Sequence, residues 1–220
     1  MNVAVGLAHA EAFDLALTGA PALLVGDDGR MLPAAITRWH APADGEDGWL
    51  VDRCTGPTVD LGCGPGRLVA ELMGRGVPVL GVDCSRRAVR ECHSRGGPVL
   101  HRDIFARLPD EGRWHHALLA DGNIGIGGDP LLLLKRCAAL VRPGGTVLVE
   151  TASETDAPGS GLWRGAARLH DTDGDPPGPC FPWAVLGLGA LVVLAGHADL
   201  QARDWHRGER CFVELCRAAP

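Results

Sequence analysis

Short apolar runs alternate with helical patterns through the middle of the chain, from Thr55 to Glu150. Strands that alternate with helices in this way are typical of a parallel sheet with helices on both faces. The pattern therefore predicts a doubly wound α/β domain. Its helices are expected near Gly66–Arg75, Ser85–Ser94 and Asp129–Val141, the last one stopped by Pro143 and Gly144.

The N-terminal segment, residues 1–52, has a different pattern from the domain that follows at 53–220. His9–Leu17 reads as a short amphipathic helix that ends at Thr18-Gly19. Two short runs, Ala22–Val25 and Met31–Ile36, read as a hairpin that turns at Asp28-Gly29. A loop is expected at 41–48. Two roles stay open for the whole N-terminal segment: a lid over the site, or an extension that only packs against the domain.

The C-terminal part is expected to be looser. Leu162–His170 reads as an extra strand, and the proline-rich segment Asp171–Pro182 reads as a loop. Ala184–Leu200 reads as an apolar helix of small residues. Two strands, Gln201–Trp205 and Arg210–Arg217, then flank a turn at 207–209.

The most informative segment is Thr58-Val-Asp-Leu-Gly-Cys-Gly-Pro-Gly-Arg67, which reads as a strand, a tight glycine turn and the start of a helix. Glycines at alternate positions allow the backbone to come close to a ligand, because no Cβ intervenes. A dinucleotide fingerprint spaces its glycines differently, as G-x-G-x-x-G. Asp60 also lies close to the turn, where a carboxylate suits a positively charged amino group better than a phosphate.

Three more apolar runs end in an acid. Asp83 follows Gly62 by 21 positions, at the end of the second run. An acid placed in this way can accept both hydroxyls of a ribose; the competing interpretation is a surface aspartate before a helix capped by Ser85. Asp103 and Asp121 end the third and fourth runs, and Pro143-Gly-Gly145 turns the next helix into a fifth apolar run.

Taken in this order, these features resemble class I S-adenosylmethionine (SAM) methyltransferases. The resemblance implies a seven-stranded, mostly parallel, Rossmann-like sheet closed by an antiparallel C-terminal hairpin. It implies SAM as cofactor and a small-molecule acceptor methylated on oxygen, nitrogen or carbon. By position, the residues expected to bind cofactor are Asp60, Gly62, Cys63, Gly64, Gly66, Asp83, Cys84, Asp103, Ile104 and Asp121.

Candidates for the chemistry lie after the fourth run and among the histidines. Asp121 and Asn123 occupy the position where the family presents residues to methyl donor and acceptor. A histidine is a natural general base because its pKa lies near working pH, and His40 and His170 are the best placed of the nine. Three tryptophans are candidates to line the acceptor pocket, namely Trp39, Trp163 and Trp183.

Composition narrows the partners. The 220-residue chain is 46% hydrophobic and 22% charged, carries a formal net charge of −6 and has a single lysine, Lys135. Without clustered cations, nucleic acid is a poor partner. The eight cysteines form no C-x-x-C pair, and histidine motifs with metal spacing are absent, so neither a disulfide framework nor a metal site is expected.

No signal peptide is read at the N-terminus, and the longest apolar stretch, Ala184–Gly196, is too short and glycine-broken to span a bilayer. The expected location is the cytoplasm, as a monomer or homodimer. Abundant Arg, Gly, Ala and Pro would suit a bacterial enzyme of secondary metabolism. Two alternatives stay open: an enzyme of this fold that uses bound SAM for a non-methylating reaction, and a non-catalytic SAM-binding module.

Overall fold

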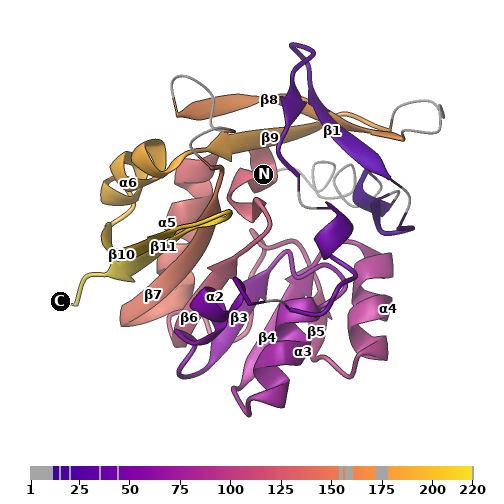
Figure 1. Ribbon diagram of the computed structural model, residues 1–220. Coiled ribbons are helices and arrows are strands. Elements are labelled where there is room, and N and C mark those ends of the chain that lie inside the picture. The colour runs from indigo at the N-terminus through magenta and orange to yellow at the C-terminus, as the bar shows by residue number, and fades with distance from the viewer. Residues whose placement is uncertain are drawn as a thin grey trace.

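The computed structural model describes residues 12–14, 16–19, 21–34, 36–43, 45–153, 156, 161–171 and 178–219. A seven-stranded sheet forms its centre, in the order β10-β11-β7-β6-β3-β4-β5 (Figure 1). Its strands are β3 (Thr58–Leu61), β4 (Val79–Asp83), β5 (Val99–His101), β6 (Trp114–Leu119), β7 (Val141–Thr151), β10 (Leu200–Arg207) and β11 (Cys211–Arg217).

The strands β3 to β7 pair in parallel, whereas β11 runs antiparallel both to β7 and to β10. The predicted doubly wound sheet with an antiparallel C-terminal hairpin is therefore confirmed. Because parallel strands point the same way, the residues that follow β3, β4, β5 and β6 meet at one edge of the sheet.

The three predicted helices are also confirmed, as α3 (Arg67–Gly74), α4 (Arg86–Ser94) and α5 (Pro130–Leu140). The hydroxyl of Ser85 caps α4 by accepting hydrogen bonds from the backbone N–H groups of the third and second residues after it, both at 3.1 Å. Asp129 caps α5 by accepting a hydrogen bond from the N–H of Leu132 at 3.1 Å. Three shorter helices also lie in the described part of the chain, namely η1 (Ile36–Arg38), α2 (Gly48–Val51) and η2 (Asn123–Gly128).

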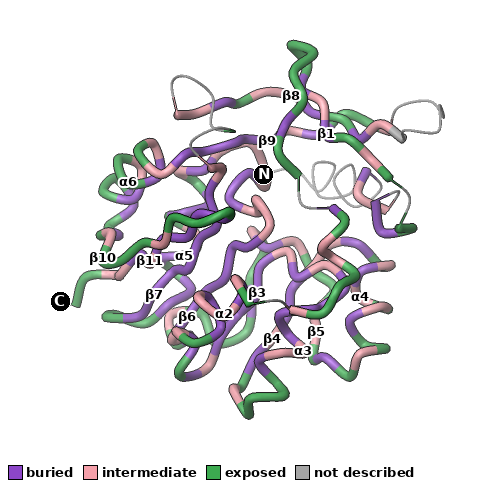
Figure 2. Tube along the Cα trace, viewed as in Figure 1, coloured by how far each residue is buried: buried purple, intermediate pink, exposed green. Residues whose placement is uncertain are grey.

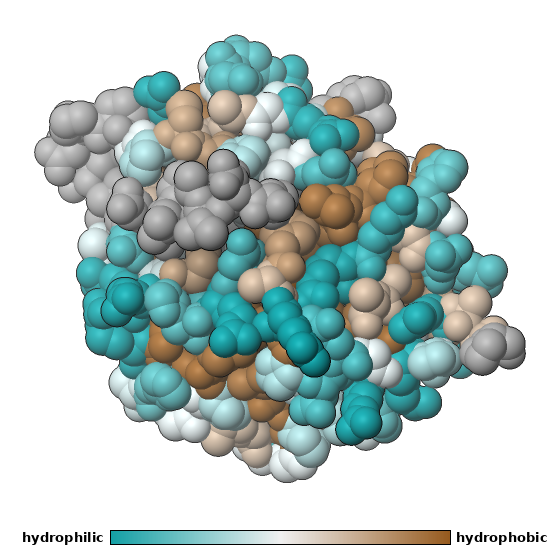
Figure 3. All heavy atoms as spheres, turned by 180° about the vertical axis from the view of Figure 1, so that it is seen from behind, coloured by the Kyte–Doolittle hydropathy of each residue, from teal (hydrophilic) through white to brown (hydrophobic). Residues whose placement is uncertain are grey.

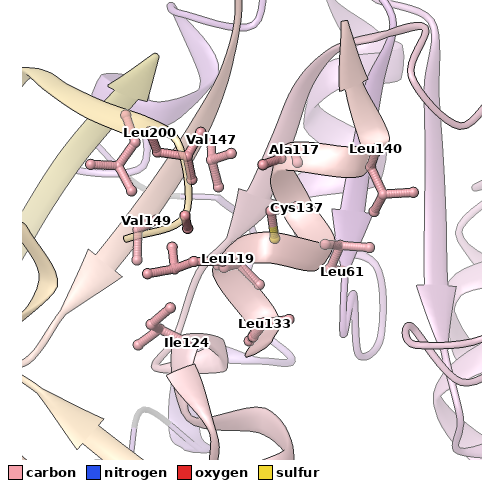
Figure 4. Packing of buried hydrophobic residues seen from close by; sticks show 14 of the residues in the cluster. Leu61, Ala117, Leu119, Ile124, Leu133, Cys137, Leu140, Val147, Val149 and Leu200 are labelled. Atoms are coloured by element: carbon pink, nitrogen blue, oxygen red, sulfur yellow. The ribbon is translucent and has the colours of Figure 1, made fainter. Parts of the chain in front are cut away.

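The apolar core fills both faces of the central sheet, as the period of two along its strands requires. In β6, Ala117 and Leu119 face the cluster that contains α5, whereas Leu118 faces the cluster that contains α3. Figure 4 shows the first cluster, and Figure 2 shows that burial follows the central strands. The outer surface seen from behind is mainly hydrophilic, with separate apolar areas (Figure 3).

A second, four-stranded antiparallel sheet lies above the first, in the order β2-β1-β8-β9 (Figure 1). It consists of β1 (Ala22–Gly26), β2 (Met31–Leu32), β8 (Leu162–Asp171) and β9 (Phe181–Leu186). The predicted N-terminal hairpin and the predicted extra strand are thus present, and the hairpin pairs with the strand. The second strand of the hairpin is shorter than the predicted Met31–Ile36, because it ends at Leu32 and Ile36 begins η1. Of the predicted helix at 9–17, residues 12–14 and 16 are helical, and the rest lie outside the described residues except Leu17, which is in a turn.

One element was predicted wrongly. The expected helix Ala184–Leu200 is instead the end of β9, a helix α6 (Leu188–Gly196) and the first residue of β10. Ala184–Leu186 are buried and pair with β8, so tertiary packing overrides their helical pattern. Pro182, expected in a loop, lies within β9; as an edge strand, β9 tolerates a residue without an N–H donor.

Candidate functional site

A pocket opens at the carboxyl edge of the central sheet, beneath the second sheet, and residues from the N-terminal segment and from the central sheet both line it. Of the sequence-predicted residues, its lining contains Asp60, Gly62, Cys63, Gly64, Asp83, Cys84, Asp103, Ile104, Asp121 and Asn123. Positions spread over more than sixty residues of sequence therefore share one cavity.

The glycine turn after β3 has a left-handed backbone at each of its three glycines, with φ values of +73° at Gly62, +54° at Gly64 and +82° at Gly66. This conformation favours glycine over any residue with a side chain. A Cβ at Gly64 would meet no atom within 4 Å, so the turn leaves open space there. A Cβ at Gly66 would lie 2.4 Å from Sγ of Cys92, and Gly66 is not among the lining residues. Its role in the structure is close packing against α4.

Asp83 is held in place at the end of β4 by two backbone donors. The N–H of Gly64 donates to Oδ2 at 2.9 Å, and the N–H of Ser85 donates to Oδ1 at 2.8 Å. Burial raises the pKa of the Asp83 carboxyl, although these two hydrogen bonds oppose the rise. Since each carboxylate oxygen has a further lone pair, Asp83 can still accept two hydroxyl donors from a ligand.

Asp60 is nearly buried, with 2% of its surface exposed, and its carboxylate accepts no hydrogen bond from the described residues. Burial raises its pKa to about 7, against the opposing effect of the guanidinium of Arg67. A buried carboxylate without a hydrogen-bond donor is costly. The arrangement therefore suits a ligand that brings a cationic donor to this end of the pocket.

Asp103 and Ile104 follow β5 as the sequence predicted. Oδ1 of Asp103 accepts a hydrogen bond from the N–H of Phe105 at 2.9 Å, and Ile104 is 5% exposed beside it. One polar acceptor next to an apolar side chain can contact the edge and the face of a flat ring.

Comparison with known proteins supports the same family. A family model described as a methyltransferase domain matches residues 58–145. An uncharacterised methyltransferase of Mycobacterium tuberculosis is 36% identical over 110 residues, which are 48% of this chain and 54% of that protein. The chain thus matches only about half the length of the first curated relatives.

Two solved structures share the fold. A SAM-dependent methyltransferase from Bacteroides fragilis, in complex with S-adenosyl-L-homocysteine, superposes with a TM-score of 0.72 over 97% of this chain and 95% of its own, at 17% identity. The sugar N-methyltransferase KedS8 from a Streptoalloteichus species gives a TM-score of 0.58 over 77% of this chain and 84% of its own, at 14% identity. Residues 58–145 of this chain thus match a methyltransferase domain, within a Rossmann-like fold.

The methyltransferase domain also contains a buried ionic network that the sequence did not reveal. Asp121 has a left-handed backbone (φ 53°) and accepts hydrogen bonds from Arg67, with Nη2 at 2.9 Å from each of its two carboxylate oxygens. Arg67 also pairs with Asp47, which is 1% exposed. Burial raises the pKa of the Asp121 carboxyl, while Arg67 works in the opposite direction. Both oxygens of Asp121 are thus committed to a structural ion pair.

The network continues through Arg210, which donates to Asp47 at 2.6 Å and to Glu150 at 2.7 and 2.9 Å. Arg38 of η1 reaches the same Glu150 carboxylate at 3.2 Å. The sequence could have pointed to Arg67, because this residue directly follows the glycine turn. Asp47 and Arg210 lie 163 positions apart, and no local pattern joins them.

Asn123 braces the glycine turn of the methyltransferase domain. Its Nδ2 donates to the carbonyl oxygens of Leu61 at 3.0 Å and Gly62 at 2.8 Å. The sequence predicted that Asn123 lies near the cofactor or the acceptor, and the structure places Asn123 in the lining of the pocket. The contacts give it a positioning role toward the turn.

The structure does not bring the two predicted base histidines into the pocket. His40 is exposed, with Nδ1 at 3.5 Å from a carboxylate oxygen of Glu91. His170 lies in β8 opposite Leu23, in the second sheet. Neither histidine lines the pocket: His40 lies in a turn after η1, and His170 lies in a strand of the second sheet.

Of the three tryptophans proposed for the acceptor pocket, Trp39 and Trp183 line it. Trp163 does not, since its indole N–H donates to Asp28 at 3.1 Å and its ring packs over Gly26. Within the described residues, no group of three or more His, Cys, Asp or Glu side chains is arranged to hold a metal ion. No helix of the described part is long and apolar enough to cross a membrane.

Proposed function

We propose that this protein is a SAM-dependent methyltransferase that transfers a methyl group to an oxygen, nitrogen or carbon of a small-molecule acceptor. The observation that carries the proposal is the placing of Asp83, whose carboxylate is aligned by the N–H of Gly64 in the same pocket as Asp60 and Asp103. When bound, SAM supplies a methyl group that is already strongly electrophilic, so alignment and water exclusion are the protein's main tasks.

The donor set fits SAM residue by residue. Asp83 would accept the ribose hydroxyls, and Asp103 with Ile104 would contact the adenine amino group and ring. Asp60, a buried carboxylate that accepts no hydrogen bond from the described residues, would receive the ammonium of the methionyl part. Gly64 offers the open space that close approach to the cofactor requires.

We also propose residues 1–52 as a lid over the site. Phe13, Leu17, Leu24 and Trp39 from this segment line the pocket that Asp60 and the glycine turn line from the other side. The proposed setting is the cytoplasm of a bacterium, in secondary metabolism. One structure with a similar fold, CalS10, is an amino pentose methyltransferase of calicheamicin biosynthesis.

Calorimetric titration with SAM, S-adenosylhomocysteine and NAD tests the cofactor. We expect micromolar binding of the first two and none of NAD. Asp83→Ala removes two hydrogen bonds to a charged group, which corresponds to a loss of about 3 kcal/mol or more, or at least ~100-fold in affinity. Asp52→Ala is the matched control, because the Asp52 side chain is 67% exposed and is not among the residues that line the pocket.

Binding of NAD, or unchanged SAM affinity in Asp83→Ala, would overturn the proposal. Product mass then distinguishes methyl transfer from the non-methylating alternative. A methyl transfer adds one carbon to the acceptor and releases one S-adenosylhomocysteine for each turnover.

A further inference from the structure

The pocket has two ends of different chemistry. One end holds the acids and the glycine turn described above. The other is formed by aromatic and aliphatic side chains from the N-terminal segment, from η2 and from β9, namely Phe13, Leu17, Leu24, Pro33, Trp39, Ile126 and Trp183. The cofactor residues account for the first end and leave the second end without an assigned ligand.

The aromatic side chains at the second end form one connected wall. The ring of Phe13 lies 5.7 Å from that of Trp39 and 5.5 Å from that of Trp183, with tilted planes. Behind them, Phe181 supports Phe13 at 4.9 Å and Trp183 at 5.9 Å. Phe181 is 1% exposed, whereas Phe13 and Trp39 keep part of their surface open. A braced wall with open ring surface suits a flat apolar ligand, since aromatic pairs prefer tilted or offset contacts at these distances.

The charges that line the pocket also favour an uncharged ligand. Arg67 is the cation in its lining, and its guanidinium is already paired with Asp47 and Asp121. Asp60 and Asp103 have no cationic side chain bonded to them among the described residues. A negative charge on a ligand in this pocket would be repelled by these carboxylates. An anionic ligand is therefore disfavoured, and a neutral one is not.

We infer that the methyl acceptor is an uncharged molecule with a flat apolar ring, which binds against Phe13, Trp39 and Trp183, and that carboxylated analogues are rejected. This inference rests on the proposed function, because it assigns the acceptor end of the same pocket.

Two isosteric probes test the inference: 2-naphthamide, which is neutral, and 2-naphthoate, which carries one negative charge. Each is titrated into the full chain saturated with S-adenosylhomocysteine, and binding is followed by ligand-observed NMR and calorimetry. We expect saturable binding of 2-naphthamide and at least tenfold weaker binding of 2-naphthoate. Trp183→Ala and Trp39→Ala should each weaken 2-naphthamide at least tenfold and leave affinity for S-adenosylhomocysteine within about threefold of the parent.

Trp205→Ala is the matched control, because Trp205 is 53% exposed in β10 and does not line the pocket. It should bind both probes as the parent does. Thermal melting of each variant checks that it folds. If Trp183→Ala does not fold, Trp39→Ala alone tests the contribution of the aromatic wall.

The outcomes separate the two proposals. Equal or tighter binding of 2-naphthoate overturns the charge argument. Absence of 2-naphthamide binding, or parent-like binding by both tryptophan variants, overturns the assignment of the wall while the cofactor site stands. Failure of S-adenosylhomocysteine itself to bind removes the proposed function, and the inference with it.

Discussion

Replacing Asp60 with Asn should make the ligand-free protein more stable and the cofactor complex weaker. The carboxyl has an ordinary pKa of 3.8 and a pKa of about 7 in the folded chain, with burial as the main cause. At about 1.4 kcal/mol for each pKa unit, the charged form costs at most about 4 kcal/mol of folding free energy. Because the carboxylate faces a pocket that water can enter, we expect about 1 to 3 kcal/mol.

The sign of the pH dependence follows from the raised pKa. Below pH 3.8 the carboxyl of Asp60 is protonated in both folded and unfolded chains, and this stability is fully present. As the pH rises toward 7, the unfolded chain loses its proton first, so the folded state loses stability relative to it. Asn carries no titrating proton, and the advantage of the variant should therefore grow between pH 5 and pH 8.

Cofactor binding should change in the opposite direction. Ionised Asp60 would pair with the ammonium of SAM, so the affinity of the parent should rise as the pH increases from 6 to 7.5. The variant should bind SAM about 10- to 100-fold more weakly, the usual range for a lost hydrogen bond between charged groups, and its affinity should be nearly independent of pH.

Urea unfolding at pH 5 and pH 8 measures the first effect, and calorimetric titration with SAM measures the second. Asp52→Asn is the control, since its exposed side chain should change neither quantity by more than about 1 kcal/mol. A variant that is less stable than the parent at pH 8, or one with parent-like SAM affinity, would refute this account of Asp60.

Three further predictions concern the turn, a buried histidine and the ionic network. Gly64→Val should fold yet lose SAM binding in calorimetry, whereas Gly66→Val should fail to give a cooperative melt, because its side chain meets Cys92; the reverse result would exchange their roles. Burial lowers the pKa of His116 from 6.5 to about 4, so its imidazole stays neutral in the folded protein. The folded state therefore keeps its full stability above pH 6.5 and loses stability as the pH falls toward 4, because the unfolded chain takes up the proton first. His116→Asn should remove up to about 3 kcal/mol of this acid sensitivity in urea titrations, and an unchanged pH profile would contradict it. Asp47→Ala should lower the free energy of unfolding by about 3 to 5 kcal/mol, since it removes a buried counter-charge that Arg67 and Arg210 share, against at most about 1 kcal/mol for Asp52→Ala; equal losses would show that the network carries no stability.

The central sheet could be predicted because its signals are local. The glycine turn, the N-cap at Ser85 and the stop at Pro143-Gly144 each mark an element boundary within a few residues. The misplaced helix at Ala184–Leu200 shows the limit of such signals. A run of small apolar residues fits a buried strand as well as a helix, and pairing with β8 decides between them.

The same distinction holds for the site. The acids at the strand ends could be predicted, because parallel strands deliver their carboxyl ends to one edge. The role of Asp121 in an ion pair could not, because it depends on Arg67 and Asp47 meeting in space. Histidine chemistry was a poor guide, since a favourable pKa does not place His40 or His170 in the pocket.

The ionic network lies where the proposed lid meets the methyltransferase domain, and its links differ in strength. Asp47 is 1% exposed and is held by Arg67 and Arg210 from two sides, so pulling it away would take one buried counter-charge from each of two guanidinium groups. The pair between Arg38 and Glu150 is weaker, because 35% of the Arg38 side chain is exposed and such pairs contribute about 1 kcal/mol or less. If the lid opens, it should therefore release at Arg38 while Asp47 stays fixed. Any hinge then lies between these two residues, in the segment that the sequence predicted as a loop.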